Sequence, residues 1–127
     1  MKLYGVRIFV DDFDKAHEFY SDLLALPTNW RADGMRAAGY GLENAELIVE
    51  EAKAADKGLV GRFVGISMTI DNIGAAYETL SGRGVRFEGP PEKQEWGGTL
   101  AHFRDPAGNV VGLLGKGGEF QLSLATA

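Results

Sequence analysis

The chain contains no cysteine, and this absence excludes disulfide bonds, thiolate metal sites and cysteine nucleophiles. It also lacks any run rich in lysine or arginine, and its formal net charge is −5. Such a surface repels phosphate backbones, so we expect no nucleic-acid partner. No segment approaches the ~20 apolar residues that span a bilayer, and no apolar leader is visible. We therefore expect a cytoplasmic protein with no membrane partner.

What the chain does have is an internal repeat. GVRIFVDDF, residues 5–13, lies over GISMTIDNI, residues 65–73, at an offset of 60 residues. A repeat at a fixed offset indicates a fold assembled from similar units. Because the chain has 127 residues, 45% of them hydrophobic, we expect one domain, residues 1–127, made of two similar halves with a cleft between them.

The first half has the pattern of a strand followed by a helix. Residues 3–10 are rich in branched and aromatic side chains, which favours a strand. Asp11 and Asp12 then offer a helix N-cap, and Pro27 stops the helix that follows.

The second half repeats this plan, with a strand over residues 64–70 and a cap at Asp71 or Asn72. Gly82 and Gly84 close its helix. Further strands are predicted over residues 29–32, 35–40, 46–50, 86–87, 99–104 and 109–114. The plan therefore comprises a first module of residues 1–51, a linker of 52–62, a second module of 63–115 and a tail of 116–127.

The opening VRIFVDDFDKAHEFYSDLLALP and the closing WGGTLAHFRDPAGNVVGLLG, taken with the duplicated layout, resemble the vicinal oxygen chelate superfamily. That superfamily includes glyoxalases, extradiol dioxygenases and bleomycin resistance proteins. The resemblance implies an α+β fold in which tandem βαβββ modules form a cup-shaped mixed sheet. It also implies a homodimer, to which the tail segment 120–124 would contribute.

The resemblance places metal-ligand positions at Gly5, Gly65 and Gly112, with a fourth at or near Ile48. Glycine offers no donor side chain, whereas a catalytic zinc needs three protein ligands. Glu46 and Glu50 share the strand face of the fourth position, because side chains alternate with period two. We therefore expect no metal, no other cofactor and no catalytic residue.

The resemblance, extended by strand alternation, implies which side chains face a ligand in the cup and places Trp30, Tyr40 and Trp96 at its rim. The nine expected ligand-binding residues are Arg7, Phe9, Trp30, Tyr40, Glu50, Ser67, Trp96, Leu100 and His102. Arg7 either pairs with Glu46 or Glu50, or reaches the mouth of the cup. For His102 and the aromatic residues the alternative is an ordinary packing role, although Trp96, next to two glycines, is favoured as a lid.

The resulting hypothesis is a metal-free protein that binds a small organic molecule and sequesters an aromatic or drug-like ligand. The alternative is a lyase, isomerase or dioxygenase of the same superfamily with a displaced metal site at Glu50 and His102. A third class is a regulatory or interaction module whose cup is filled by its own side chains.

Overall fold

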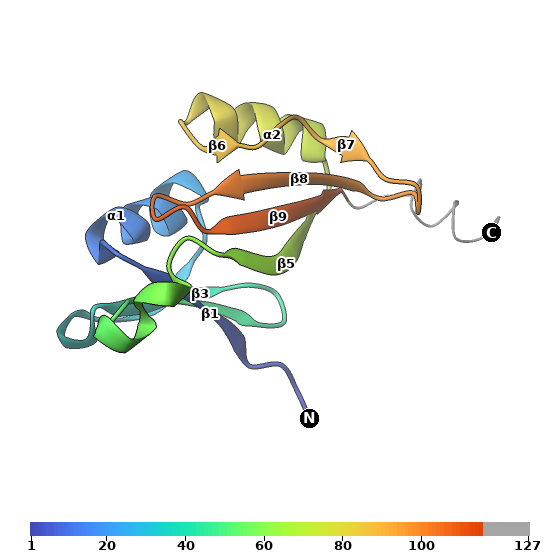
Figure 1. Cartoon of the computed structure of the whole chain (residues 1–127). Coiled ribbons are helices and arrows are strands. Elements are labelled where there is room, and N and C mark those ends of the chain that lie inside the picture. Colours follow the sequence, from blue (N-terminus) through green and yellow to red (C-terminus); the bar gives the residue numbers. More distant parts are fainter. Residues whose placement is uncertain (116–127) are drawn as a thin grey trace. The chain divides into compact units, whose positions relative to one another are not determined.

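The computed structural model describes residues 1–115, and the tail of residues 116–127 lies outside that part. The described chain forms two units, one of residues 1–64 with 105–109 and one of residues 65–104 with the strand from Val110 onward (Figure 1). Each unit contains one sheet and one α-helix. The predicted α+β fold, with two mixed sheets of βαβββ type, is confirmed.

The first sheet has the strand order β1-β4-β3-β2, in which β1 and β4 run parallel and the other neighbours run antiparallel. Parallel neighbours need a long crossover, which the helix and two strands between β1 and β4 supply. The elements of this unit are β1 (Gly5–Val10), α1 (Phe13–Glu18), the π-helical turn η1 (Phe19–Leu23), β2 (Thr28–Ala32), the 3-10 turn η2 (Asp33–Met35), β3 (Ala37–Gly41), β4 (Glu46–Glu51) and the 3-10 turn η3 (Ala54–Leu59).

Both α-helices begin at the polar residue that directly follows the strand. The Asp12 side chain accepts a hydrogen bond from the backbone N of Lys15 at 3.2 Å, and Asn72 accepts one from Ala75 N at 3.0 Å. These bonds satisfy backbone donors that the first turn of a helix leaves unpaired. The second helix ends just before Gly84, whose φ of +97° is the left-handed conformation expected there.

The core of the first unit lies between its sheet and α1. Ile8, Val10, Phe13, Tyr20 and Tyr40 each have 0% of their surface exposed. The rings of Tyr20 and Tyr40 stack with centroids 5.6 Å apart. Alternation along the strands sends every second side chain into this layer, so the remaining side chains of the sheet point away from the helix.

The turn of the DPAGN sequence closes the β8–β9 hairpin, and its ends are buried in the first unit. Asp105 accepts a hydrogen bond from the Tyr20 hydroxyl at 2.8 Å and another from the backbone N of Asn109 at 2.9 Å. The Asn109 amide donates to the backbone oxygen of Phe9 at 2.8 Å and accepts from Gly61 N at 2.9 Å. Because these contacts satisfy buried backbone groups, they explain the motif structurally, without a role in chemistry.

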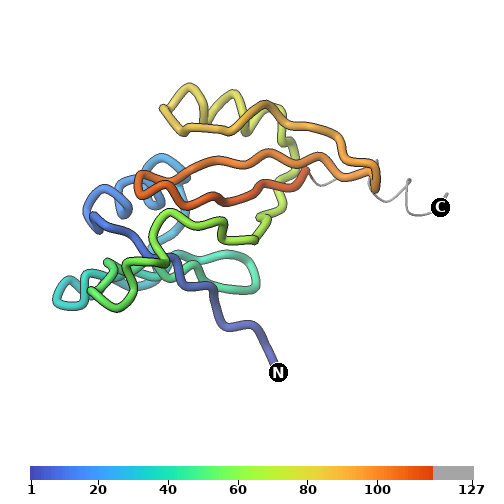
Figure 2. The backbone as a smooth tube through the Cα atoms, viewed as in Figure 1, coloured from blue at the N-terminus to red at the C-terminus, as the bar shows by residue number. Residues whose placement is uncertain are grey.

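The second sheet has the order β5-β9-β8-β6, and the short β7 also pairs with β8. Its helix α2 lies beside β8, as the chain path in Figures 1 and 2 shows. Rings of Tyr77, Phe87 and Phe103 contact one another edge to face in this unit. The elements are β5 (Phe63–Ile70), α2 (Ile73–Gly82), β6 (Arg86–Phe87), β7 (Glu92–Lys93), β8 (Thr99–Arg104) and β9 (Val110–Gly115).

One local expectation differs from the structure. Met35 belongs to the 3-10 turn η2 rather than to a strand, because Arg36 takes a left-handed φ of +52° and the strand begins only at Ala37. The segment of residues 52–62, which the sequence suggests as a linker, contains the 3-10 turn η3. Within residues 1–115, no helix combines the length and apolar character needed to cross a membrane.

Candidate functional site

The side chains of the first sheet that point away from α1 form what we call the helix-free face. The strand register arranges them in three rows, namely Gly5 with Glu46 and Gly41, Arg7 with Ile48 and Gly39, and Phe9 with Glu50 and Ala37. Trp30 on β2 pairs with Gly39 and so joins the middle row. The structure therefore brings four predicted ligand-binding residues, Arg7, Phe9, Trp30 and Glu50, to one face.

Arg7 and Glu50 form an ion pair on this face. Arg7 Nη2 lies 2.5 Å from Glu50 Oε1, and Arg7 Nε lies 3.2 Å from Oε2, so the contact is bidentate. The guanidinium also lies over the Phe9 ring, 5.1 Å from its centroid. The hydrogen bond to Glu50 raises the pKa of Arg7. Arg7 is thus paired with Glu50, one of its two expected partners, while 62% of its side chain is exposed.

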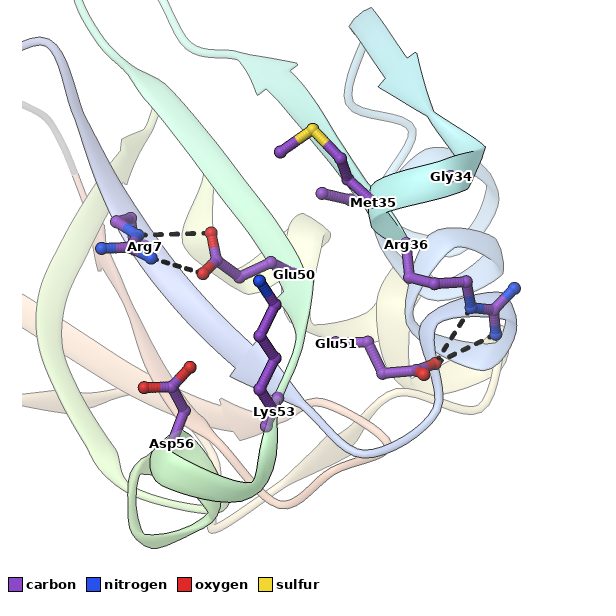
Figure 3. A pocket seen from close by; sticks show the side chains of 10 residues that line it. Arg7, Gly34, Met35, Arg36, Glu50, Glu51, Lys53 and Asp56 are labelled. Atoms are coloured by element: carbon purple, nitrogen blue, oxygen red, sulfur yellow. Dashed lines mark hydrogen bonds and ion pairs between the residues drawn. The ribbon is translucent and has the colours of Figure 1, made fainter.

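A cavity of about 440 Å³ opens beside this ion pair (Figure 3). Met35 and Ala37 provide apolar lining. Such a volume falls in the range of small-molecule pockets, which combine apolar walls with a few polar groups. The charged and apolar side chains of its lining include those of Arg7, Met35, Ala37, Glu50, Lys53 and Asp56.

Lys53 and Asp56 come from the segment after β4 and were assigned to the linker in the sequence analysis. Neither forms an ion pair with another residue of the described chain. Asp56 is nonetheless close enough to raise the pKa of Arg7 slightly. The cavity thus presents an ammonium and a carboxylate beside the Arg7–Glu50 pair, and it can bind a molecule that carries charged or hydrogen-bonding groups.

A second polar cluster lies on the same face around Glu46, which is 9% exposed. Its Oε1 accepts a hydrogen bond from Trp30 Nε1 at 2.7 Å and its Oε2 accepts one from Asn29 Nδ2 at 2.9 Å. The Tyr4 hydroxyl donates a longer bond of 3.5 Å. The hydrogen bonds from Asn29 and Trp30 lower the pKa of Glu46, against the effect of burial, which raises it.

Sequence reasoning named Glu46 as sharing the face of the fourth metal-ligand position and as a possible partner of Arg7, and it missed Asn29. The sequence feature that could have indicated the contacts of Asn29 and Trp30 with Glu46 is the pair of glycines on β3. A Cβ at Gly39 would lie 2.2 Å from Trp30 Nε1, and one at Gly41 would lie 2.9 Å from Asn29 Oδ1. Only glycine leaves room there for two side chains of β2 to cross over β3 and reach β4.

Tyr40 has the packing role that the sequence left open for the aromatic residues. It lies on the helix side of β3, where its hydroxyl is hydrogen-bonded to His17 Nδ1 at 2.6 Å. Burial raises the pKa of Tyr40 to about 12. The expectation that Tyr40 rims a ligand cup does not fit this position, because strand alternation turns its ring toward Tyr20 and away from the helix-free face.

In the second unit, Ser67 and His102 flank Gly112 on the sheet face opposite α2. A Cβ at Gly112 would lie 3.0 Å from Ser67 Oγ and 3.4 Å from His102 Cδ2, and the register pairs His102 with Gly112. Leu100 and His102 also line a cavity of about 200 Å³. The register pairs His102 with Gly112 and Leu100 with Leu114, so Leu100, His102 and Gly112 lie on one face of the sheet.

Trp96 lies in the tight hairpin turn between β7 and β8. Gly97 N donates to Gln94 O at 3.0 Å, and Gly97 has a φ of +102°. The Trp96 ring lies against Gly98, where a Cβ would be 2.0 Å from its Cζ3. The ring is 43% exposed but lines neither cavity described above, so its role as a lid stays a prediction.

The residues present do not fit a metal ion at the positions that the resemblance implies. A Cβ at Gly5 would lie 2.6 Å from the backbone oxygen of Glu46, and Gly65 has a left-handed φ of +79°. Both positions therefore resist a ligand side chain, as does Gly112 between Ser67 and His102. Within residues 1–115, no group of three or more histidines, cysteines or acidic residues is placed to hold a metal ion.

With this geometry described, comparison with known proteins defines the family. The model of the Glyoxalase/Bleomycin resistance protein/Dioxygenase superfamily matches residues 3–113, and the chain belongs to this superfamily. The chain is 32% identical to the protein YraH of Bacillus subtilis (strain 168), over 87% of this chain and 95% of YraH.

Solved structures of the superfamily are similar over almost their whole length. A member from Sphaerobacter thermophilus DSM 20745 superposes with a TM-score of 0.77 at 29% identity, covering 91% of this chain and 98% of that one. TnmS3 from Streptomyces sp. CB03234, described as an antibiotic binding protein, gives a TM-score of 0.77 at 25% identity, covering 92% and 97%.

Proposed function

We propose that this protein binds a small organic molecule stoichiometrically and sequesters it, without a metal ion and without chemical conversion. The observation that carries the proposal is the cavity of about 440 Å³ beside the Arg7–Glu50 pair, on a sheet whose expected metal position is a glycine. The similarity to TnmS3, an antibiotic binding protein, supports the same class of function.

Binding in this cavity would combine charge recognition with apolar contact. Lys53 and Arg7 attract anionic groups of a ligand, whereas Asp56 and Glu50 attract cationic ones. Met35 is 72% exposed and unbranched, so it can adapt to ligands of different shape. Because Arg7 already has a partner, a ligand anion must compete with Glu50 or share the guanidinium with it.

The test is a thermal-shift screen of the full chain against aromatic antibiotics, aldehydes, thiols and the divalent ions of zinc, nickel, manganese and iron. A ligand that binds the folded state raises its melting temperature by mass action, about 2.7 kcal/mol of stabilisation at a concentration 100-fold above Kd. We expect a shift with an organic compound and none with the metal ions. A metal-induced shift together with one tightly bound equivalent by elemental analysis would reject the metal-free part.

The cavity itself is tested with Arg7→Ala and Glu50→Gln. Both variants should bind a compound found in the screen more weakly than the parent does, as measured by isothermal titration calorimetry. Arg86→Ala, which removes another exposed arginine, is the matched control and should bind like the parent. Equal affinity in all four proteins would place the site elsewhere.

We also propose a homodimer, as the resemblance implies. The first unit exposes several large apolar side chains, including Leu3 at 67%, Tyr4 at 71% and Phe63 at 67%. Exposed apolar surface of this kind is typical of interaction sites. Light scattering at micromolar concentration tests the proposal, and a monomeric mass would reject it. The tail segment 120–124, expected to contribute, lies outside the described residues.

A further inference from the structure

The hydrogen bond between Trp30 and Glu46 bridges two strands that are not neighbours. Trp30 is on β2 and Glu46 is on β4, with β3 between them. Neighbouring strands lie about 4.8 Å apart, so the two side chains must meet over β3. They do so above Gly39, where both Trp30 Nε1 and Glu46 Oε1 occupy the space that a Cβ would fill.

Glu46 is itself held in place from more than one side. Asn29 fixes one carboxylate oxygen at 2.9 Å, while Trp30 at 2.7 Å and Tyr4 at 3.5 Å share the other. These three donors are neutral groups that reach β4 from both sides in the sheet, Tyr4 from beside β1 and the other two from β2. A carboxylate with both oxygens engaged has little freedom to rotate, and hydrogen bonds to a charged acceptor are stronger than those between neutral groups.

The indole that this network fixes is only partly buried. Trp30 shares its row with Arg7, through Gly39 and Ile48, and the next row contains Glu50 and Ala37 of the cavity. Successive rows lie about 7 Å apart, since side chains on one face repeat every two residues. Trp30 does not line the cavity itself, so a molecule bound beside Arg7 meets its ring only if it extends along the sheet toward β3.

We propose that Glu46 is a positioning residue that holds the Trp30 indole over Gly39 as a stacking platform for a planar aromatic ligand. The proposal rests on the proposed function and names the ligand class of the same face: a flat conjugated ring that stacks on Trp30 and carries an ionised group directed toward Arg7. Stacking on a fixed ring loses less conformational entropy than stacking on a mobile one.

The first experiment tests the position of the ring without any ligand. The chain has two tryptophans, so the indole N–H signal that persists in Trp96→Phe belongs to Trp30. Hydrogen exchange of that N–H is then measured by NMR in the parent, Glu46→Ala, Glu46→Gln and Glu43→Ala. We expect exchange at least about tenfold faster in Glu46→Ala, because the acceptor is gone. Glu46→Gln should recover part of the protection through its amide oxygen, and Glu43→Ala should match the parent.

The second experiment tests the platform with two probes of the same charge and similar size. 2-Naphthoate is planar, whereas decahydro-2-naphthoate has the same carboxylate on a saturated, puckered ring system. We expect 2-naphthoate to shift the Trp30 indole signal and to bind at least about fivefold more weakly to Glu46→Ala than to the parent, with recovery in Glu46→Gln. Decahydro-2-naphthoate should bind weakly to all variants.

The outcomes separate the two proposals. Unchanged indole exchange in Glu46→Ala overturns the role of Glu46 as a positioning residue. Faster exchange with unchanged 2-naphthoate affinity, or equal affinity for the two probes, overturns the platform. If the parent binds neither probe nor any compound of the thermal-shift screen, the proposed function and the platform both fail, while the exchange data still decide what Glu46 does to Trp30.

Discussion

Glu46 and Glu50 lie four residues apart on the same face of β4, yet the surroundings of the two carboxylates differ. Glu46 is buried, with 9% of its surface exposed, and it accepts hydrogen bonds from neutral donors. Glu50 pairs with the guanidinium of Arg7 at the surface, beside a cavity. One carboxylate organises a fixed arrangement of side chains, and the other is placed where a ligand can exchange with its partner.

The difference shows that the strength of a charge interaction depends on its surroundings. The Arg7–Glu50 pair is bidentate, but its arginine is mostly in solvent, where ion pairs contribute little to stability and salt screens them. The bonds to Glu46 involve no opposite charge, but their loss leaves the partly buried Trp30 indole without a partner, whereas the exposed Asn29 amide can bind water instead. We therefore expect Glu46 to matter for stability and Glu50 to matter for binding.

The strongest test of this comparison is Gly39→Ala. The new Cβ would lie 2.2 Å from Trp30 Nε1 and 2.5 Å from Glu46 Oε1, so the bridge must break or the strands must separate. Overpacking and lost hydrogen bonds together should destabilise the fold by about 3 kcal/mol, measured by urea unfolding. Gly34→Ala is the matched control, because nothing lies within 4 Å of its Cβ position. A loss below about 0.5 kcal/mol in Gly39→Ala would contradict the bridge.

The next largest effect is expected from Glu46→Ala, which leaves the Trp30 indole and the Asn29 amide without their acceptor. Unpaired donors in a partly buried place should lower the free energy of unfolding by about 2 kcal/mol. The same urea titration measures it, with Glu43→Ala as the control. A loss no larger than that of the control would mean that water replaces the carboxylate without cost.

A smaller effect is expected in the pH dependence of stability. Hydrogen bonds from Asn29 and Trp30 hold the pKa of Glu46 below its usual value of 4.5. A carboxyl group whose pKa is lower in the folded state stabilises the fold above its unfolded pKa, and this contribution disappears as the pH falls through the folded pKa. Urea unfolding between about pH 3 and pH 6 should thus show a steeper acid loss in the parent than in Glu46→Gln. Parallel curves of unfolding free energy against pH would show that Glu46 makes no such contribution.

The smallest stability effect is expected for Arg7→Ala, because its guanidinium is mostly exposed. The melting temperature of Arg7→Ala should fall less below that of the parent than the melting temperature of Glu46→Ala does. The difference between Arg7→Ala and the parent should shrink further in 0.5 M sodium chloride, where the screening length is about 4 Å. Differential scanning calorimetry at low and high salt measures both values. A decrease in melting temperature as large as that of Glu46→Ala would mean that the interactions of Glu50 and Glu46 contribute equally to stability.

Much of the fold could be predicted because its signals are local or periodic. The repeat at an offset of 60 residues located the two modules, and Asp12 and Asn72 begin the helices where the capping pattern placed them. The alternation of side chains assigned Arg7 and Glu50 to one face before any strand pairing was known. Such patterns depend on chain geometry that every strand and helix shares.

The details of the site depended on contacts between residues distant in sequence. Tyr40 was expected at a ligand, but the register of β3 against its neighbours turns it into the helix-side core. Lys53 and Asp56 looked like parts of a linker, and the turn η3 brings them to the cavity. No local pattern predicts which partner a side chain meets across a sheet.

The sequence by itself therefore determined the duplicated α+β plan, the starts of the two helices and the alternation of faces along each strand, since each is a matter of local geometry, and with the family resemblance it put glycines at the expected metal positions. Only the tertiary structure decided that Arg7 pairs with Glu50 and that Glu46 holds Trp30 across Gly39. Both choices depend on strand order and register, which place residues from β1, β2 and β4 within hydrogen-bonding distance of one another.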